Sequence, residues 1–252
     1  MAVVGSGPGG LTAAYYLAKL GHSVTVFEQF PKAGGMMRVG IPDYRLPPDI
    51  LDAEIHIIEE AGVDIKLNTK IESLDDLFEQ GYDAVFLAVG AHRGMKMGVE
   101  GEDSPGVVDG ASFLRRVNLG EKIDLGKEVA VVGGGNVAID SARTALRLGA
   151  QNVTILYRRT RAEMPASPEE VEAALEEKIN IVYLAAPVKI SQSNDRLEVI
   201  CVRMELGEPD ASGRRRPVPI KGSEFSAIFD SCLLYTSPSP RDLSTSRMPS
   251  SA

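Results

Sequence analysis

The chain of 252 residues is long enough for one large or two small domains, since a typical domain has about 150 residues. Its 44% hydrophobic and 25% charged residues are those of a folded globular protein, and its net charge of -8 argues against nucleic acid as a partner. The sequence contains no stretch of about 18 apolar residues, which is the length that would predict a membrane span. Two cysteines, without a signal-peptide pattern, favour a reducing cytoplasm.

The first predicted unit is a short apolar strand at residues 2–4, a glycine-rich turn and a helix. Gly5, Gly7 and Gly10 match the pattern G-x-G-x-x-G. In this pattern the first glycine permits a tight turn, the second lets a pyrophosphate approach the backbone, and the third lets helix and strand pack closely. The candidate binding residues of this turn are Gly5, Ser6, Gly7, Pro8, Gly9 and Gly10.

A second apolar strand, at residues 24–27, ends at Glu28, which lies 18 residues beyond Gly10. A carboxylate at this position accepts hydrogen bonds from both ribose hydroxyls of an adenosine and repels a phosphorylated ribose. We therefore expect FAD or NAD, rather than NADP, at this first site. The alternative is a glycine turn that serves packing alone.

A second glycine pair, Gly34 and Gly35, precedes Met36 and a loop that contains Arg45. Two interpretations stay open: a surface loop, or a loop that lies along the ribityl-pyrophosphate of a flavin, with Arg45 against a phosphate or the isoalloxazine edge. The later part of this unit is predicted to contain a helix, a strand, a short helix and a buried parallel strand, at residues 49–62, 63–67, 73–80 and 83–90.

Residues 92–127 are richer in glycine, proline and charge, and we interpret them as a connection between domains. The first pattern then restarts, with a strand at 128–132, a glycine turn, a helix at 137–148 and a strand at 153–157. Two such units, with their glycine turns 128 residues apart, predict two parallel dinucleotide-binding sheets.

The second turn matches the variant G-x-G-x-x-A, and its candidate binding residues are Gly133, Gly135, Asn136, Val137 and Ala138. The strand that follows ends in Arg158 and Arg159 instead of a carboxylate. Guanidinium groups at the ribose position favour a 2′-phosphate through charge-assisted hydrogen bonds. The sequence therefore predicts NADP(H) at the second site; the alternative is that this arginine pair only solvates a strand end.

The remainder is less regular, with an acidic helix at 168–178, a strand at 181–184 and an extended segment at 196–204. The basic run 214–216 is interpreted as a mobile charged loop, the alternative being a docking site for an acidic partner. From about Tyr235 the chain is rich in serine and proline and has no apolar period, which predicts a disordered tail.

One site for FAD and one for NADPH indicate a flavoprotein in which the nicotinamide delivers hydride to the flavin. No catalytic side chain is predicted, and the three scattered histidines indicate no metal site. Cys201 and Cys232 lie 31 residues apart and late in the chain, which argues against a redox dithiol relay.

Together, these motifs resemble the small subunit of NADPH-dependent glutamate synthase and its relatives, the flavin domains of dihydropyrimidine dehydrogenase and of ferredoxin:NADP transhydrogenase large subunits. The resemblance runs from residue 3 to about residue 230 and includes the motif at 84–91, which contains Gly90. It implies an α/β fold with two Rossmann-like domains, an FAD domain and an inserted NADPH domain. The residues that it assigns to FAD, beyond the first glycine turn, are Glu28, Met36, Arg45 and a backbone contact near Ile71; those assigned to NADPH are 135–138, Arg158 and Arg159.

From this resemblance we expect an FAD-binding part at residues 1–108, an NADPH-binding domain at 109–231 and a disordered, non-native tail at 232–252. The family carries cluster-binding cysteines ahead of the first glycine turn and a flavin-contacting segment after the NADPH domain, so we expect a fragment with an incomplete FAD domain. Electrons would pass from FAD to iron–sulfur clusters in a missing segment or a partner subunit. The alternatives are a truncated, non-catalytic dinucleotide-binding module and a flavin disulfide reductase with a cysteine supplied by a partner.

Overall fold

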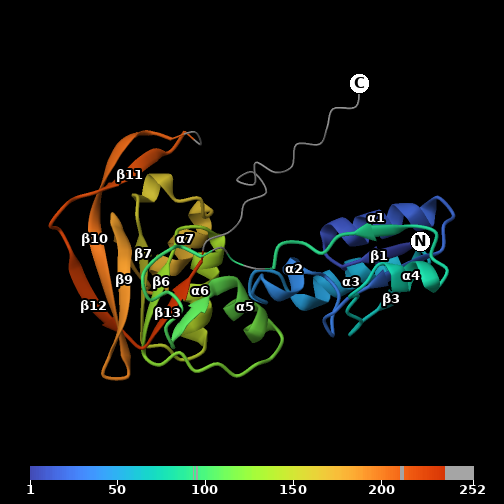
Figure 1. The fold of residues 1–252 in the computed structure, drawn as a ribbon, viewed down its shortest axis with the longest axis horizontal. Helices are drawn as coiled ribbons and strands as arrows, with labels where there is room; N and C mark the ends of the chain where they lie inside the picture. The colour runs from blue at the N-terminus through green and yellow to red at the C-terminus, as the bar shows by residue number, and fades with distance from the viewer. Residues whose placement is uncertain (93, 95, 211–212, 236–252) are drawn as a thin grey trace. The chain divides into compact units, whose positions relative to one another are not determined.

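The computed structural model describes residues 1–92, 94, 96–210 and 213–235 (Figure 1). Contacts divide the chain into two compact units, the first formed by residues 1–92 and 114–121 and the second by residues 93–113 and those from 122 onward. The expected boundary at residue 108 differs from this division because strand β5 (Val107–Asp109) pairs with the second sheet. Among the described residues, none of the helices combines the length and the apolarity that a membrane crossing requires.

The first unit is built on a parallel four-stranded sheet of order β3-β2-β1-β4. Its strands are β1 (Ala2–Val4), β2 (Val24–Phe27), β3 (Val63–Lys66) and β4 (Val85–Leu87). Its helices are α1 (Pro8–Lys19), α2 (Met36–Val39), α3 (Pro48–Glu60) and α4 (Asp75–Glu79).

Helix α1 follows β1 directly because the chain supplies both a start and a stop signal. Pro8 occupies the first turn, where its missing N–H costs no hydrogen bond, and Gly21 takes a φ of +91° just beyond the last turn. The buried face of α1 packs through Ala14 against strand residues such as Val3 and Val26. The predicted strand–turn–helix–strand unit is thus present.

The predicted buried strand at 83–90 differs from the structure. Only Val85–Leu87 form a strand, and β4 lies at the edge of the sheet as described. Phe86 and Leu87 are 43% and 55% exposed. A continuous apolar run predicts a strand covered on both faces, but the number of layers that cover an edge strand is decided by tertiary structure.

The second unit contains a parallel five-stranded sheet of order β5-β13-β6-β7-β8. The strands that join β5 are β6 (Glu128–Val132), β7 (Asn152–Tyr157), β8 (Asn180–Tyr183) and β13 (Ser231–Leu234). The helical segments are α5 (Gly110–Asn118), whose last residues belong to the first unit, α6 (Asn136–Arg147), the 3-10 turn η1 (Arg161–Glu163) and α7 (Pro168–Glu176).

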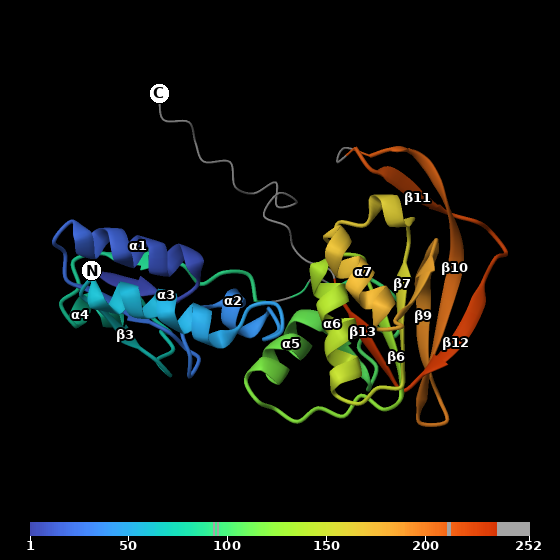
Figure 2. The same cartoon turned by 180° about the vertical axis from the view of Figure 1, so that it is seen from behind.

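An antiparallel sheet completes the second unit. Its strands are β9 (Ala185–Ser193), β10 (Arg196–Pro209), β11 (Arg215–Pro219) and β12 (Phe225–Phe229). Strand β10 pairs with β9, β11 and β12 in turn. Figures 1 and 2 show this sheet on one side of the parallel strands and helices α6 and α7 on the other, so the unit has three layers.

Two sequence-based expectations are wrong in this unit. The run 214–216, interpreted as a mobile loop, enters strand β11 at Arg215. The tail expected from residue 232 begins too early, because residues 232–234 belong to β13, a buried strand between β5 and β6. An apolar strand of four residues is too short to stand out before a serine- and proline-rich segment. The rest of the expected tail, 236–252, lies outside the described residues.

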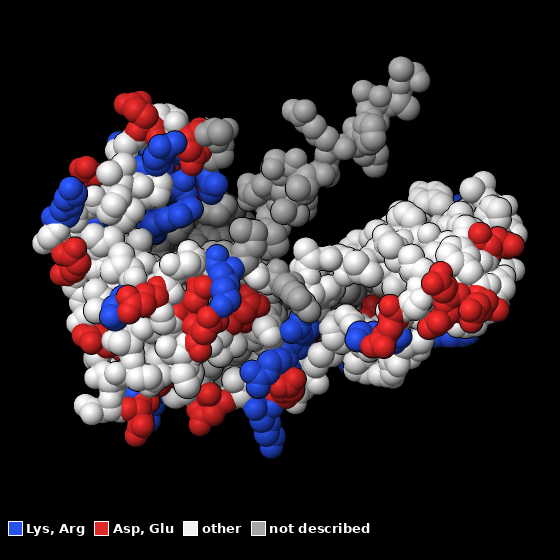
Figure 3. Space-filling model, viewed as in Figure 1, with Lys and Arg blue, Asp and Glu red and all other residues white. Residues whose placement is uncertain are grey.

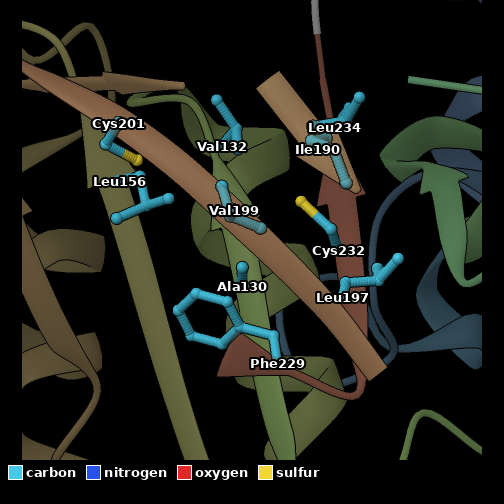
Figure 4. Packing of buried hydrophobic residues seen from close by; sticks show 10 residues of the cluster. All are labelled: Ala130, Val132, Leu156, Ile190, Leu197, Val199, Cys201, Phe229, Cys232 and Leu234. Carbon is cyan, nitrogen blue, oxygen red and sulfur yellow. The ribbon is translucent and has the colours of Figure 1, made fainter. Parts of the chain in front are cut away.

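The two sheets of the second unit are joined by one apolar core (Figure 4). Leu197 and Val199 of β10 face Ala130 of β6 and Cys232 of β13, and Phe229 closes the cluster. Burying such side chains stabilises by about 1.5–3 kcal/mol each. This cluster fixes the antiparallel sheet on the parallel one.

Leu197→Ala should therefore lower the free energy of unfolding of the second unit by about 2–5 kcal/mol, because it leaves a cavity between the sheets. The matched control is Ile228→Ala on β12, since Leu197 is 1% and Ile228 40% exposed. Urea unfolding followed by far-UV circular dichroism measures both variants. Equal losses would contradict the proposed packing of the two sheets.

Candidate dinucleotide-binding sites

A first cavity, of about 380 Å³, lies where β1 and β2 end and α1 begins. Ten of the sequence-predicted site residues line it: Gly5, Ser6, Gly7, Pro8, Gly9, Glu28, Gly35, Met36, Ile71 and Gly90. These residues come from five separate stretches of chain, and the parallel strands bring them together because their carboxyl ends meet at one edge of the sheet.

Backbone segments approach each other closely around this cavity. A Cβ on Gly10 would lie 2.0 Å from the carbonyl oxygen of Gly5, so only glycine lets α1 pack this near the end of β1. A Cβ on Gly35 would lie 2.5 Å from Cα of Gly7, and Gly35 has a φ of +54°. The glycine turn and the second glycine pair therefore form one continuous wall.

The N-terminus of α1 contributes to the cavity through Gly7, Pro8 and Gly9. Gly7 is the N-cap, no side chain caps the helix, and its first turn holds no acidic residue. The N–H groups of the first turn are thus available to an anion, and the helix dipole favours negative charge there.

Glu28 is buried and held in one orientation. Its Oε2 accepts hydrogen bonds from the Ser6 N–H (3.1 Å) and the Ser6 hydroxyl (2.5 Å), and its Oε1 accepts one from the Phe30 N–H (2.8 Å). A carboxylate has about four acceptor positions, so Glu28 keeps capacity for a further donor. Three of these positions are used, so about one remains, on Oε1, and it fits one hydroxyl of a ribose.

His92 was not singled out by any sequence pattern, yet it lines the same cavity. Its ring lies 5.8 Å from the ring of Phe30, and its Nδ1 is buried without a hydrogen-bond partner among the described residues. Burial, and then the nearby Arg115, lowers the pKa of His92. A neutral imidazole with an unsatisfied buried nitrogen indicates a position where a polar ligand atom completes the site.

Two predicted residues of the first site lie elsewhere. Gly10 does not line the cavity and instead permits the close approach of α1 to the turn. Arg45 is half-buried in the loop after α2 and is not among the lining residues. Thr69 and Lys70, beside Ile71, line the cavity and follow β3 without any recognisable sequence motif.

A second cavity, of about 410 Å³, lies in the second unit at the ends of β6 and β7. Gly133, Arg158 and Arg159 line it, as the sequence predicts. Arg158 is exposed, whereas Arg159 is buried. Partial removal from solvent lowers the pKa of Arg158, and the charge of Arg159 is the second cause. An arginine nevertheless remains protonated at neutral pH.

The other predicted residues of the second turn support this cavity without lining it. Gly135 is the N-cap of α6, and Ala138 is buried in the contact between that helix and Gly133. The side-chain oxygen of Asn136 accepts a hydrogen bond from the Ser167 N–H (2.9 Å).

An unpredicted wall of the second cavity is formed by Tyr157 and Pro165. The Tyr157 hydroxyl donates to the Glu163 carbonyl oxygen (2.7 Å), and the Ala166 N–H donates to the Gly134 carbonyl oxygen (3.1 Å). These two bonds hold the segment after β7 against the glycine turn.

Both cysteines are buried in the core of the second unit (Figure 4), and neither lines the first or the second cavity. Burial raises the pKa of Cys201 to about 11 and that of Cys232 to about 12. Neither thiol forms the thiolate that redox exchange needs. Among the described residues, no group of three or more His, Cys, Asp or Glu side chains is placed to hold a metal ion.

Two parallel sheets, each with a cavity beside the glycine turn that follows a strand, define the fold of a flavin- and nicotinamide-dependent oxidoreductase. Residues 1–210 match the family described as pyridine nucleotide-disulphide oxidoreductase, and the chain belongs to that family. The sequence-based predictions of this class of enzyme and of its α/β fold are confirmed.

The chain is 52% identical to the NADP(+)-dependent formate dehydrogenase subunit beta of Moorella thermoacetica, over 89% of this chain and 33% of that one. It is 38% identical to the glutamate synthase [NADPH] small chain of Escherichia coli, over 93% and 53%. The predicted resemblance to the glutamate synthase small subunit is thereby confirmed. The chain spans about a third to a half of the length of these two relatives.

Among solved structures, Mycobacterium tuberculosis FprA in complex with NADPH matches with a TM-score of 0.80. The match covers 95% of this chain and 71% of that protein at 21% identity, so it supports the fold.

The buried thiols give a direct chemical prediction. At about pH 8, the folded protein should react with a thiol reagent such as 5,5′-dithiobis(2-nitrobenzoate) much more slowly than the urea-unfolded chain, because both thiols stay neutral and covered. Cys201→Ser should halve the number of thiols that react in the unfolded chain and leave the folded protein slow to react. Rapid reaction of either cysteine in the folded protein would contradict the burial of the thiols.

Proposed function

We propose that this chain binds FAD at the first cavity and NADPH at the second, and that it moves reducing equivalents from NADPH to FAD. The single observation that carries this proposal is the opposite charge at two equivalent positions. Glu28 follows the strand after the first glycine turn, and Arg158 follows the strand after the second. A carboxylate selects a ribose with free hydroxyls, whereas a guanidinium selects a 2′-phosphate.

The residues of the first cavity fit the adenosine and pyrophosphate of FAD. The uncapped N-terminus of α1 supplies N–H donors for the pyrophosphate, and Glu28 keeps acceptor capacity for the ribose. Gly35 and Met36 would extend this contact along the cofactor. The assignment of Arg45 to FAD rests on the family resemblance alone.

The residues of the second cavity fit NADPH. Gly133 and Gly134 leave the end of β6 open beside the cavity, and Arg158 supplies positive charge at its rim. Apolar side chains such as Val99 and Pro187 also line this cavity. This combination of an apolar surface and a few placed charges is typical of a nucleotide site.

In this proposal the chemistry resides in the cofactors, since bound FAD supplies an acceptor of hydride. The chain binds and orients the two cofactors and sets the charge around each ribose. No nucleophile or metal is required, which agrees with the buried, neutral state of Cys201 and Cys232.

We further propose that electrons leave FAD for iron–sulfur clusters of a partner subunit or of another segment. The support is that the relatives carry names of enzyme subunits, a formate dehydrogenase beta subunit and a glutamate synthase small chain. Iron–sulfur clusters are held mainly by cysteine thiolates, and both cysteines of this chain lie in a hydrophobic core. The cytoplasmic location expected from the sequence stays a prediction.

The second candidate function is a dinucleotide-binding module without reductase activity. A flavin disulfide reductase would need a cysteine from a partner, because the chain's own thiols are buried.

Anaerobic titration of the FAD-loaded protein with NADPH tests the proposed function. We expect the absorbance of oxidised flavin to fall in proportion to added NADPH and to recover when a chemical oxidant is added. Dithionite serves as the control that the bound flavin can be reduced. If dithionite reduces the flavin and NADPH does not, the chain is a binding module and the proposed reductase is wrong.

Gly35→Ala should lower FAD affinity by roughly tenfold or more, which corresponds to about 1.4 kcal/mol. The reason is that its Cβ would push against the backbone of Gly7, 2.5 Å away. The matched control is Gly62→Ala, which also has a positive φ (+96°) but has open space around its Cβ. Flavin absorbance per chain after gel filtration measures binding; equal loss in both variants would show that backbone strain alone is responsible.

A further inference from the structure

The end of the β10–β11 hairpin lies at the carboxyl end of β7, where the second cavity opens. Within the hairpin, the Asp210 N–H donates to the Arg214 carbonyl oxygen (2.8 Å) and the Gly213 N–H donates to the Asp210 carbonyl oxygen (2.9 Å). On the face shown in Figure 3, basic side chains gather at the end of the second unit that carries β11. Arg214 lines the second cavity together with Arg158.

Arg159 holds this hairpin in place. Its side chain is 5% exposed, its Nε donates to the Arg215 carbonyl oxygen (2.7 Å), and its Nη2 pairs with Oδ2 of Asp210 (2.6 Å). The guanidinium therefore donates to both arms of the hairpin, to Asp210 just beyond the end of β10 and to Arg215 at the start of β11.

The geometry thus separates the roles of the two neighbouring arginines after β7. Arg158 is exposed at the cavity, whereas Arg159 ties down the hairpin that delivers Arg214 to the same cavity. Asp210 is the carboxylate that pairs with Arg159. Like charges held near one another raise the free energy of the empty site, and an anion bound between them relieves this repulsion.

The electrostatics of the neighbouring groups agree with this geometry. Partial burial is the largest cause that lowers the pKa of Arg158, and the charges of Arg159 and Arg214 lower it further. The same three arginines oppose the rise that burial causes in the pKa of Tyr157. Positive charge from β7 and from the hairpin thus acts on one side of the cavity.

We propose that Arg158 and Arg214 together bind the 2′-phosphate of NADP(H), and that Arg159 is a positioning residue that acts through Arg214. This inference rests on the proposed function, because it refines the nucleotide site of the second cavity. It replaces the sequence-based pair of adjacent arginines with a pair drawn from two sheets. The preference for NADP(H) over NAD(H) then depends on the antiparallel sheet as well as on the parallel one.

The test compares the binding of NADP⁺ and NAD⁺ by isothermal titration calorimetry, since the two differ only in the 2′-phosphate. Arg214→Gln should weaken NADP⁺ roughly ten- to 100-fold, the loss expected for a hydrogen bond to a charged group, and leave NAD⁺ nearly unchanged. Unchanged NAD⁺ binding also shows that the variant is folded. The matched control is Arg216→Gln, which removes the same charge from an exposed position on β11 and should change neither affinity.

A double variant tests the role of Arg159. Arg159→Gln alone should weaken NADP⁺ in the same way as Arg214→Gln, and the double variant should be little weaker than either single variant, because Arg159 acts through Arg214. Losses that multiply would show that Arg159 contacts the phosphate itself and would overturn its assignment as a positioning residue.

The outcomes distinguish this inference from the proposed function. If the wild-type protein binds neither nucleotide, the proposed function fails and the inference fails with it. If the wild-type protein prefers NADP⁺ and Arg214→Gln keeps that preference, only the inference is overturned.

Discussion

Where a strand passes directly into a helix at these sites, the first turn of the helix lies so close to the end of the strand that a large side chain between them would clash with the backbone. In the first unit this constraint falls on Gly10, whose missing Cβ leaves room for the Gly5 carbonyl oxygen. In the second unit Ala138 occupies the matching contact, and Gly133, with a φ of +141°, supplies the turn. Each turn thus places its helix directly after the strand, and each cavity is lined in part by one of these turns.

The two cavities differ in how their selective charges are held. Glu28 is oriented by its own turn, through the Ser6 backbone and hydroxyl. In the proposed phosphate site, by contrast, Arg214 comes from a different sheet and is positioned through Arg159. The selective carboxylate of the first site is therefore held within its own parallel sheet, whereas the second site depends on the core that joins the parallel and antiparallel sheets.

The core also explains why this member of a disulphide oxidoreductase family has inert cysteines. Cys201 and Cys232 pack among apolar side chains, and burial raises the pKa of both thiols. A buried cysteine behaves as a small apolar residue. For this chain the family's name thus describes a fold and its cofactor chemistry, and neither of the two thiols is exposed for disulphide exchange.

The sequence by itself determined the features that depend on neighbouring residues. Glycine spacing, the carboxylate at Glu28 and the arginines at 158–159 follow from local backbone geometry and charge, so both strand–turn–helix units could be predicted. Long-range contacts decided the rest. Strand β13 lies between β5 and β6, which are far from it in the sequence, and β4 lies at the edge of its sheet. His92 and Arg214 reach the cavities in the same way, because tertiary packing brings together residues that no local period relates.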